Sequence, residues 1–163
     1  MGGQISLQSA EGKGSTFRIE LPFKVGRTFK AHTPRQSDIQ QPLLGKRILL
    51  AEDNPVNVVI ADKILKKWSA ELSFAENGAQ AVEKWRVEHP DLILMDLRMP
   101  ELSGIEATRV IRGEETQKTP IIALTASAML DEQNEIFTVG MDEYVSKPFN
   151  PAELLSKISK HIV

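Results

Sequence analysis

The sequence predicts an α/β fold in which residues 46–163 form a (βα)5 doubly wound parallel sheet, preceded by a small hairpin. Two observations lead to this prediction. From Lys46 onward, short apolar runs alternate with longer amphipathic segments, which is the pattern of parallel strands joined by crossover helices. Helix-start signals also recur, because Asn54-Pro55 and Asn150-Pro151 each place a capping side chain before a proline at the first helical position.

The first 45 residues differ in character from the rest of the chain. Polar and apolar residues alternate on both sides of a glycine-rich turn, which predicts a two-stranded hairpin over residues 1–23. A hairpin alone is marginally stable in water, so we interpret it as the remnant of a larger unit. Residues 24–45 contain two prolines and little periodicity, and we expect them to be a linker. The apolar hairpin positions are Ile5, Leu7, Phe17, Ile19 and Leu21.

Five strand–helix pairs are expected after the linker. The third strand is apolar throughout, as expected where helices cover both faces of a sheet. In the first helix, apolar residues from Val58 to Trp68 recur at helical spacing and should face the sheet. In the last helix, Glu153 lies where a carboxylate favours the positive end of the helix dipole. The strands are expected at 47–51, 71–75, 92–95, 120–124 and 143–146, and the helices at 55–68, 78–88, 104–113, 127–139 and 151–162.

Composition argues against several classes of function. The 163 residues are 41% hydrophobic and 26% charged, as in an ordinary globular protein, and a formal net charge of -2 gives no reason to expect nucleic-acid binding. The chain has no cysteine, so disulfides and thiolate metal sites are excluded. Its longest apolar stretch, 121–130, is much shorter than the roughly 20 residues that span a bilayer. No signal-peptide pattern opens the sequence, and we expect a cytoplasmic segment without membrane contact.

Polar side chains stand at the carboxyl ends of four predicted strands. Glu52 and Asp53 follow the first strand, Asp96 follows the third, Thr125 the fourth and Lys147 the fifth. In a doubly wound sheet, ligands bind beyond the carboxyl ends of the strands. We therefore expect these side chains to form one site.

The chemistry of this set indicates a magnesium-dependent phosphoryl acceptor. Three carboxylates at one edge would repel one another unless a cation lies among them, and Mg²⁺ prefers such hard oxygen ligands. Lys147 adds an ammonium group, and Thr125 adds a hydroxyl donor. Together they suit a carboxylate nucleophile that receives a phosphoryl group while its neighbours spread the charge.

The same residues resemble a known family in their order and spacing. Residues 46–163 closely resemble the receiver domain of two-component response regulators, which implies a flavodoxin-like strand order of 2-1-3-4-5. The motifs that carry the resemblance are Glu52-Asp53, Asp96 followed by Met99-Pro100 and Gly104, Thr125-Ala126, and Lys147-Pro148.

By this resemblance, Asp96 is the phosphorylation site. Magnesium would be bound by Asp53, Asp96 and the Arg98 carbonyl, with Glu52 acting partly through water. The donor would be a phosphohistidine of the parent or of a partner kinase, and a histidine phosphotransfer domain could receive the group afterwards.

The resemblance also implies a conformational switch. Thr125 and Lys147 would contact the phosphoryl group, Lys147-Pro148 would be a cis peptide, and Tyr144 would turn inward as Thr125 moves. A plain core role for Tyr144 stays open. The surface formed by the fourth helix, fifth strand and fifth helix could then mediate a homodimer.

Residues 1–23 resemble a second domain, the last stretch of the ATP-binding catalytic domain of a histidine kinase, on the glycine-rich turn GKGST. This resemblance implies that the parent is a hybrid histidine kinase with an attached receiver in a phosphorelay. The fragment itself is assigned no ATP binding, and its only expected activity is to take up and slowly lose phosphate on Asp96.

Two alternatives come from other classes of function. Aspartate-nucleophile phosphatases carry a second aspartate two residues after the nucleophile, and this chain has Arg98 there, so turnover of phosphate esters is not expected. A receiver-like interaction module without phosphorylation is the other alternative. Such modules usually lack one of the acidic or lysine positions, and all of these positions are occupied here.

Overall fold

The computed structural model describes residues 2–10, 12, 14–22, 41–126 and 129–163. The chain divides into two compact units, Met1–Asp38 and Ile39–Val163. Most of the predicted linker, residues 24–40, and the predicted helix start at Ser127 lie outside the described residues.

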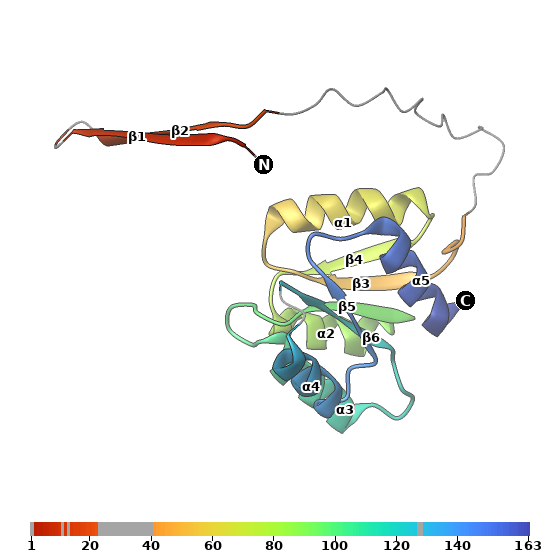
Figure 1. Cartoon of the computed structure of the whole chain (residues 1–163). Coiled ribbons are helices and arrows are strands. Elements are labelled where there is room, and N and C mark those ends of the chain that lie inside the picture. The colour runs from red at the N-terminus through yellow and green to blue at the C-terminus, as the bar shows by residue number, and fades with distance from the viewer. Residues whose placement is uncertain (1, 11, 13, 23–40, 127–128) are drawn as a thin grey trace. The chain divides into compact units, whose positions relative to one another are not determined.

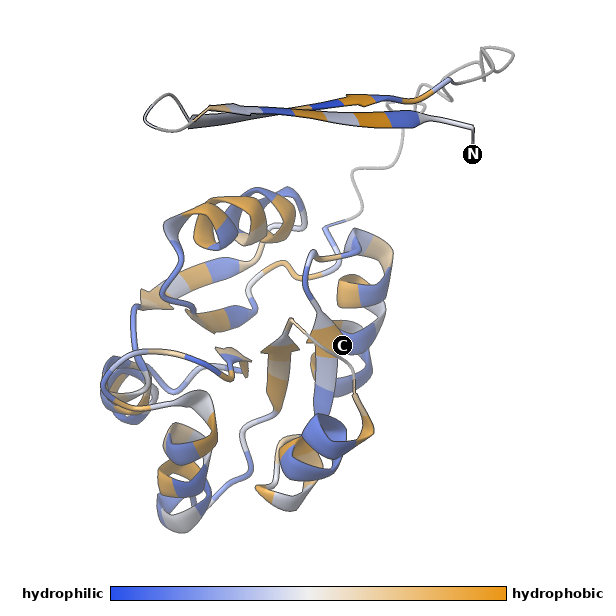
Figure 2. Cartoon of the chain, turned by 60° about the vertical axis from the view of Figure 1, so that its left-hand side comes forward, coloured by the Kyte–Doolittle hydropathy of each residue, from blue (hydrophilic) through white to orange (hydrophobic). Residues whose placement is uncertain are grey.

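The N-terminal unit contains the predicted hairpin. Strand β1 (Gln4–Ala10) pairs antiparallel with β2 (Gly14–Glu20), and the register sets Ile5 opposite Ile19 and Leu7 opposite Phe17. Alternation along each strand collects these four side chains on one face, where all are exposed. The alternation of hydrophobic and hydrophilic residues along the two strands is visible in Figure 2. The hairpin thus has an apolar face that the described residues of its own unit leave uncovered.

The C-terminal unit is built on a five-stranded sheet in which every neighbouring pair is parallel. Its order, β4-β3-β5-β6-β7, is the order 2-1-3-4-5 of the predicted strands, which confirms the expected fold class. The strands are β3 (Arg47–Ala51), β4 (Glu71–Ala75), β5 (Leu92–Asp96), β6 (Ile121–Thr125) and β7 (Glu143–Ser146).

Helices cover both faces of this sheet (Figure 1). One face packs against α1 (Pro55–Lys67) and α5 (Pro151–Ile162), and the other against α2 (Gly78–Glu88), α3 (Gly104–Glu114) and α4 (Leu130–Thr138). None of the helices in the described part of the chain has the length and apolar character needed to cross a bilayer.

The two cores explain why the strands are apolar on successive residues. Along β3, Ile48 and Leu50 join the core beneath α1 and α5, whereas Leu49 and Ala51 join the core beneath α2, α3 and α4. Every residue of β5 is buried. A strand covered on both sides is a rigid support for whatever side chain ends it, and β5 ends at Asp96.

Capping side chains set the starts of several helices. Asn54 accepts a hydrogen bond from the Val56 amide at 2.9 Å, and Asn150 caps α5 in the same way, as the Asn-Pro pairs predict. Ser103 and Glu106 form a capping box at the start of α3. By contrast, α4 begins at Leu130 with no capping side chain at Met129.

The folded C-terminal unit begins before the first strand of its sheet. Leu43 is fully buried in the core beneath α1 and α5, and its amide donates to the Trp68 carbonyl at 3.1 Å. The end of the predicted linker is therefore anchored at the amino edge of the sheet, where β3 begins.

Candidate functional site

A hollow of about 220 Å³ lies at the carboxyl edge of the parallel sheet. It brings together Glu52, Asp53, Asp96, Arg98, Thr125 and Lys147, all of which the sequence assigns to one site. The other residues that line it are Asn54, Asn57, Leu97, Leu124 and Ala126. Tyr144, the seventh predicted residue, lies elsewhere.

Gly104 allows the loop after β5 to close tightly against Asp96. A Cβ atom at Gly104 would lie 2.0 Å from the Asp96 carbonyl oxygen, which is closer than any side chain permits. The Gly104 amide donates to the Leu97 carbonyl at 3.1 Å, so the helix starts directly against the end of the strand. This glycine thereby fixes the position from which the Asp96 side chain projects.

Lys147 connects two buried carboxylates. Its Nζ donates to Glu52 Oε2 and to Asp96 Oδ2, each at 2.6 Å. The side chain of Lys147 is 15% exposed and that of Glu52 is 1% exposed. One ammonium group therefore compensates two acids in a place where water does little to screen them, and the Lys147-Pro148 bond is cis, as expected.

Glu52 has further partners that the sequence did not indicate. Its Oε1 accepts from Asn57 Nδ2 at 2.9 Å and from the Asn54 amide at 3.3 Å. Asn57 lies in the first turn of α1, where it faces the hollow. These bonds hold Glu52 in place, so it is the most constrained acid of the site.

Burial raises the pKa of the Asp96 carboxyl above its ordinary value of 3.8. The hydrogen bond and charge of Lys147 act in the opposite direction, and the nearby Glu52 carboxylate raises the pKa further. The Arg98 amide also donates to Asp96 Oδ1 at 3.2 Å. Without another cation, the ionised form of Asp96 is thus only partly compensated.

Glu52, Asp53 and Asp96 have the geometry of a cation site. One oxygen from each carboxylate lies within 4.8 Å of the others. Asp53 is exposed, whereas the other two acids are buried. The donor set contains only oxygen, which suits a hard divalent cation such as Mg²⁺, and a second positive charge would relieve the repulsion among the acids.

The hydroxyl of Thr125 bonds to a residue that the sequence did not single out. Thr125 is buried at the end of β6, and its Oγ1 donates to Glu132 Oε2 at 2.5 Å. The other oxygen of Glu132 lies 3.4 Å from the guanidinium of Arg98, whose side chain is 76% exposed. Glu132 thereby joins α4 to two strand ends of the site.

Tyr144 lies on the surface shared by α4, β7 and α5. Its ring meets that of Phe137 edge to face, with centroids 6.2 Å apart, and Lys157 Nζ lies 4.5 Å from the ring centre. Tyr144 is half-buried. These contacts place it beside the predicted interaction surface, outside the hollow.

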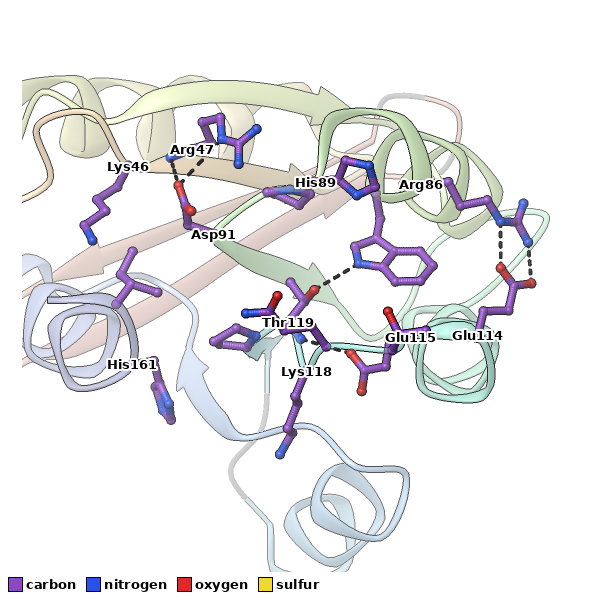
Figure 3. A pocket seen from close by; sticks show the side chains of 16 residues that line it. Lys46, Arg47, Arg86, His89, Asp91, Glu114, Glu115, Lys118, Thr119 and His161 are labelled. Atoms are coloured by element: carbon purple, nitrogen blue, oxygen red, sulfur yellow. Dashed lines mark hydrogen bonds and ion pairs between the residues drawn. The ribbon is translucent and has the colours of Figure 1, made fainter.

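A larger hollow of about 730 Å³ lies at the opposite edge, near the amino ends of β3, β5 and β6 (Figure 3). Two pairs of its charged side chains interact with each other. Arg86 bonds to Glu114 at 2.8 Å, and Arg47 Nε lies 3.7 Å from Asp91. The chemistry predicted from the sequence therefore belongs to the smaller hollow.

The chain belongs to the response regulator receiver domain family, whose pattern it matches over residues 48–159. Among curated proteins, it is similar to Autoinducer 2 sensor kinase/phosphatase LuxQ of Vibrio vulnificus, with 37% identity over 93% of this chain and 18% of that protein. It is also 32% identical to Aerobic respiration control sensor protein ArcB of Escherichia coli, over 98% of this chain and 20% of that protein. The chain spans about a fifth of the length of these relatives.

Two solved receiver structures are similar to the C-terminal unit. The receiver domain of sensor histidine kinase PA1611 from Pseudomonas aeruginosa, which has a magnesium ion in its active site cleft, is 40% identical with a TM-score of 0.68, over 72% of this chain and 98% of that chain. The other is the complex of Saccharomyces cerevisiae Ypd1, a histidine phosphotransfer protein, with the Ssk1 receiver domain. It gives 33% identity and a TM-score of 0.68, over 74% of this chain and 90% of that chain.

Proposed function

We propose that this chain is the phosphoacceptor receiver of a hybrid histidine kinase in a phosphorelay, with Asp96 as the residue phosphorylated. The observation that carries the proposal is the convergence of Lys147 and three carboxylates on one hollow, with Lys147 Nζ 2.6 Å from Asp96. Asp96 ends a strand that is buried along its whole length, and it lines the hollow.

The transfer step moves a phosphoryl group from a histidine to Asp96. A carboxylate oxygen of Asp96 attacks phosphorus while the P–N bond of the phosphohistidine breaks, and the electron pair of that bond returns to the imidazole nitrogen. When the other ring nitrogen carries a proton, the imidazole leaves as a neutral group. Lys147 follows the developing charge, because its ammonium can exchange a carboxylate oxygen for a phosphoryl oxygen.

Asp53, Asp96 and the Arg98 carbonyl would hold Mg²⁺, and Glu52 would take part through water. When bound, the ion supplies positive charge that neutralises the phosphoryl oxygens. The magnesium ion in the similar PA1611 receiver and the all-oxygen donor set found here support this assignment. The Thr125 hydroxyl would donate a hydrogen bond to the phosphoryl group. Tyr144 would turn inward as Thr125 moves and so alter the surface of α4, β7 and α5.

Mass spectrometry after incubation with Mg²⁺ and phosphoramidate tests the assignment. We expect an acid-labile phosphoryl adduct on Asp96 that disappears in Asp96→Asn and when EDTA removes the metal. Asp131→Asn, a change of the same kind at an exposed position outside the hollow, should keep the adduct. An adduct that persists in Asp96→Asn, or none under conditions that label another receiver, would refute the proposal.

We also propose that residues 1–23 are the end of an ATP-binding kinase domain, that residues 24–45 are a linker and that residues 46–163 are the receiver. The matches to LuxQ and ArcB, which extend over 93% and 98% of this chain, support a shared arrangement. The uncovered apolar face of the hairpin suits a strand pair that packs on further residues upstream. In a longer chain with those residues, the hairpin amides should exchange more slowly with solvent than in this one.

For partners, we propose a phosphohistidine donor and a histidine phosphotransfer domain that approach from the α1 side of the hollow. Val56, Val59 and Ile60 are exposed on α1, which starts just after Asp53. The Ypd1–Ssk1 complex supports this class of partner. Replacing Val59 and Ile60 by serine should slow transfer from a phosphotransfer domain and leave labelling by phosphoramidate unchanged.

We further propose a homodimer through α4, β7 and α5, where Leu130 and Phe137 are exposed. Light scattering with and without Mg²⁺ and beryllofluoride tests it, and an unchanged monomer mass would contradict it. We also propose a cytoplasmic location, because a kinase that makes the donor phosphohistidine needs ATP.

A further inference from the structure

We propose that Glu132 is a positioning residue that stabilises the resting state by accepting the hydrogen bond of the Thr125 hydroxyl. On this proposal, the phosphoryl group on Asp96 competes with Glu132 for that proton, and the exchange releases the first turn of α4. The inference rests on the proposed phosphorylation of Asp96.

Glu132 connects three parts of the fold. It lies in the first turn of α4, and its side chain is 20% exposed. One carboxylate oxygen accepts from Thr125 at the end of β6 at 2.5 Å, and the other lies 3.4 Å from Arg98 in the loop after β5. Two strand ends of the site are thus joined to a helix outside it.

The Thr125 hydroxyl cannot serve two acceptors at once. A threonine side chain carries one O–H, so while Oγ1 donates to Glu132 it has no proton to offer a phosphoryl oxygen. A hydrogen bond to a carboxylate is also stronger than one to a neutral oxygen, and Thr125 is buried, which limits replacement by water. The resting contact therefore opposes the contact that phosphorylation needs.

Among the described residues, the start of α4 has no side-chain cap and the helix buries little of its surface. Met129, at its N-cap position, makes no capping side-chain bond, and Ile136 is the residue of α4 that is fully buried. An element with little buried surface changes position at low cost. Loss of the Thr125–Glu132 bond should therefore shift α4 and change the surface where Tyr144 and Phe137 are in contact.

The test is a beryllofluoride titration in the presence of Mg²⁺, followed by amide NMR, on the whole 163-residue chain. Removing the competing acceptor in Glu132→Ala should tighten the apparent affinity by roughly tenfold. Glu132→Gln keeps an oxygen that can accept the Thr125 proton but loses its charge, so it should lie between Glu132→Ala and the wild type.

The matched control is Asp131→Asn, which removes one negative charge from the same helical turn at an exposed position. If it tightens binding as much as Glu132→Ala does, the effect belongs to the helix dipole and the proposal is wrong. Equal affinities of the wild type and Glu132→Ala also overturn it, while the proposed function stands.

A resting-state readout separates this device from a purely structural role. Without ligand, Glu132→Ala should move the Thr125 methyl and α4 amide resonances toward their beryllofluoride-bound positions in the wild type. Shifts in any other direction count against the proposal. If neither protein binds beryllofluoride, the phosphoacceptor function itself fails, and binding by Glu132→Ala alone would support the inference most strongly.

Discussion

At the residue scale, Lys147 has the largest electrostatic role in the site. Its ammonium is bonded to two carboxylates that the fold has largely removed from water, at 2.6 Å from each. Removing one partner of a buried ion pair leaves an uncompensated charge, which costs far more than losing an exposed pair. The stability of the resting protein should therefore depend on this lysine.

Lys147→Met keeps the length of the side chain and removes its charge. Without Mg²⁺, we expect it to lower the free energy of unfolding by about 3 kcal/mol, measured by urea denaturation. Lys66→Met breaks an exposed pair with Asp62, in which Lys66 is 65% exposed, and should cost less than about 1 kcal/mol. Equal losses in the two variants would contradict the electrostatic role assigned to Lys147.

Asp96→Asn should show the opposite sign, with a pH dependence that follows from burial. Because burial raises the pKa of Asp96 above 3.8, its contribution to stability is complete below 3.8 and is lost as the pH rises through the raised pKa. In metal-free buffer, Asp96→Asn should thus be more stable than the wild type at pH 7, and the difference should shrink toward pH 4.

Urea denaturation at several pH values measures this difference. Asp53→Asn, at the exposed acid of the same cluster, is the control and should raise the free energy of unfolding at pH 7 by less than Asp96→Asn does. A gain in Asp96→Asn that is independent of pH would mean that the Asp96 charge is not its source.

Which site residues could be predicted from the sequence depends on where they lie in the chain. Asp96, Thr125 and Lys147 were predictable because each stands at the carboxyl end of a predicted strand, and the ends of parallel strands meet at one edge. Asn57 and Glu132 were not, because they lie on amphipathic helices where a polar residue is usually a solvated one. Their roles follow from tertiary contacts that no local pattern records.

At the element scale, the close contact between the start of α3 and the end of β5 depends on one missing side chain. Gly104→Ala puts a methyl group 2.0 Å from a backbone oxygen of Asp96, so the loop must shift. We expect a loss of about 1–3 kcal/mol in unfolding free energy and a roughly 10- to 100-fold slower labelling by phosphoramidate.

Gly113 provides a control in the same helix. A Cβ there would meet nothing within 4 Å, so Gly113→Ala should raise the free energy of unfolding by about 0.5–1 kcal/mol and leave labelling intact. If both variants label at the wild-type rate, the contact at Gly104 does not position Asp96.

The elements themselves were largely predictable, for physical reasons that differ among them. Strands such as β5 were clear because burial on both faces leaves an uninterrupted apolar run. The starts of α1 and α5 were clear because Asn-Pro pairs cap them. The start of α4 had no such signal, and the observed helix begins at Leu130 without a capping side chain.

At the scale of the whole molecule, residues 41–163 contain a complete sheet with a core on each face, including the buried Leu43. A chain that begins at residue 41 should therefore unfold in one cooperative transition and retain its response to Mg²⁺ and beryllofluoride, as measured by denaturation and NMR. A chain that begins at residue 46 lacks Leu43 and should be less stable by about 2–4 kcal/mol. Equal stability of the two would show that Leu43 is not part of the core.

The anchoring of Leu43 has a consequence for how this unit is attached to other proteins. The backbone reaches β3 at the amino edge of the sheet, whereas Asp96 stands at the carboxyl edge. The entry of the preceding chain and the proposed phosphorylation site thus lie at opposite edges of the sheet. Lengthening or exchanging the segment before residue 41 should therefore leave access to Asp96 open. The same receiver domain could thus function behind unrelated upstream sequences.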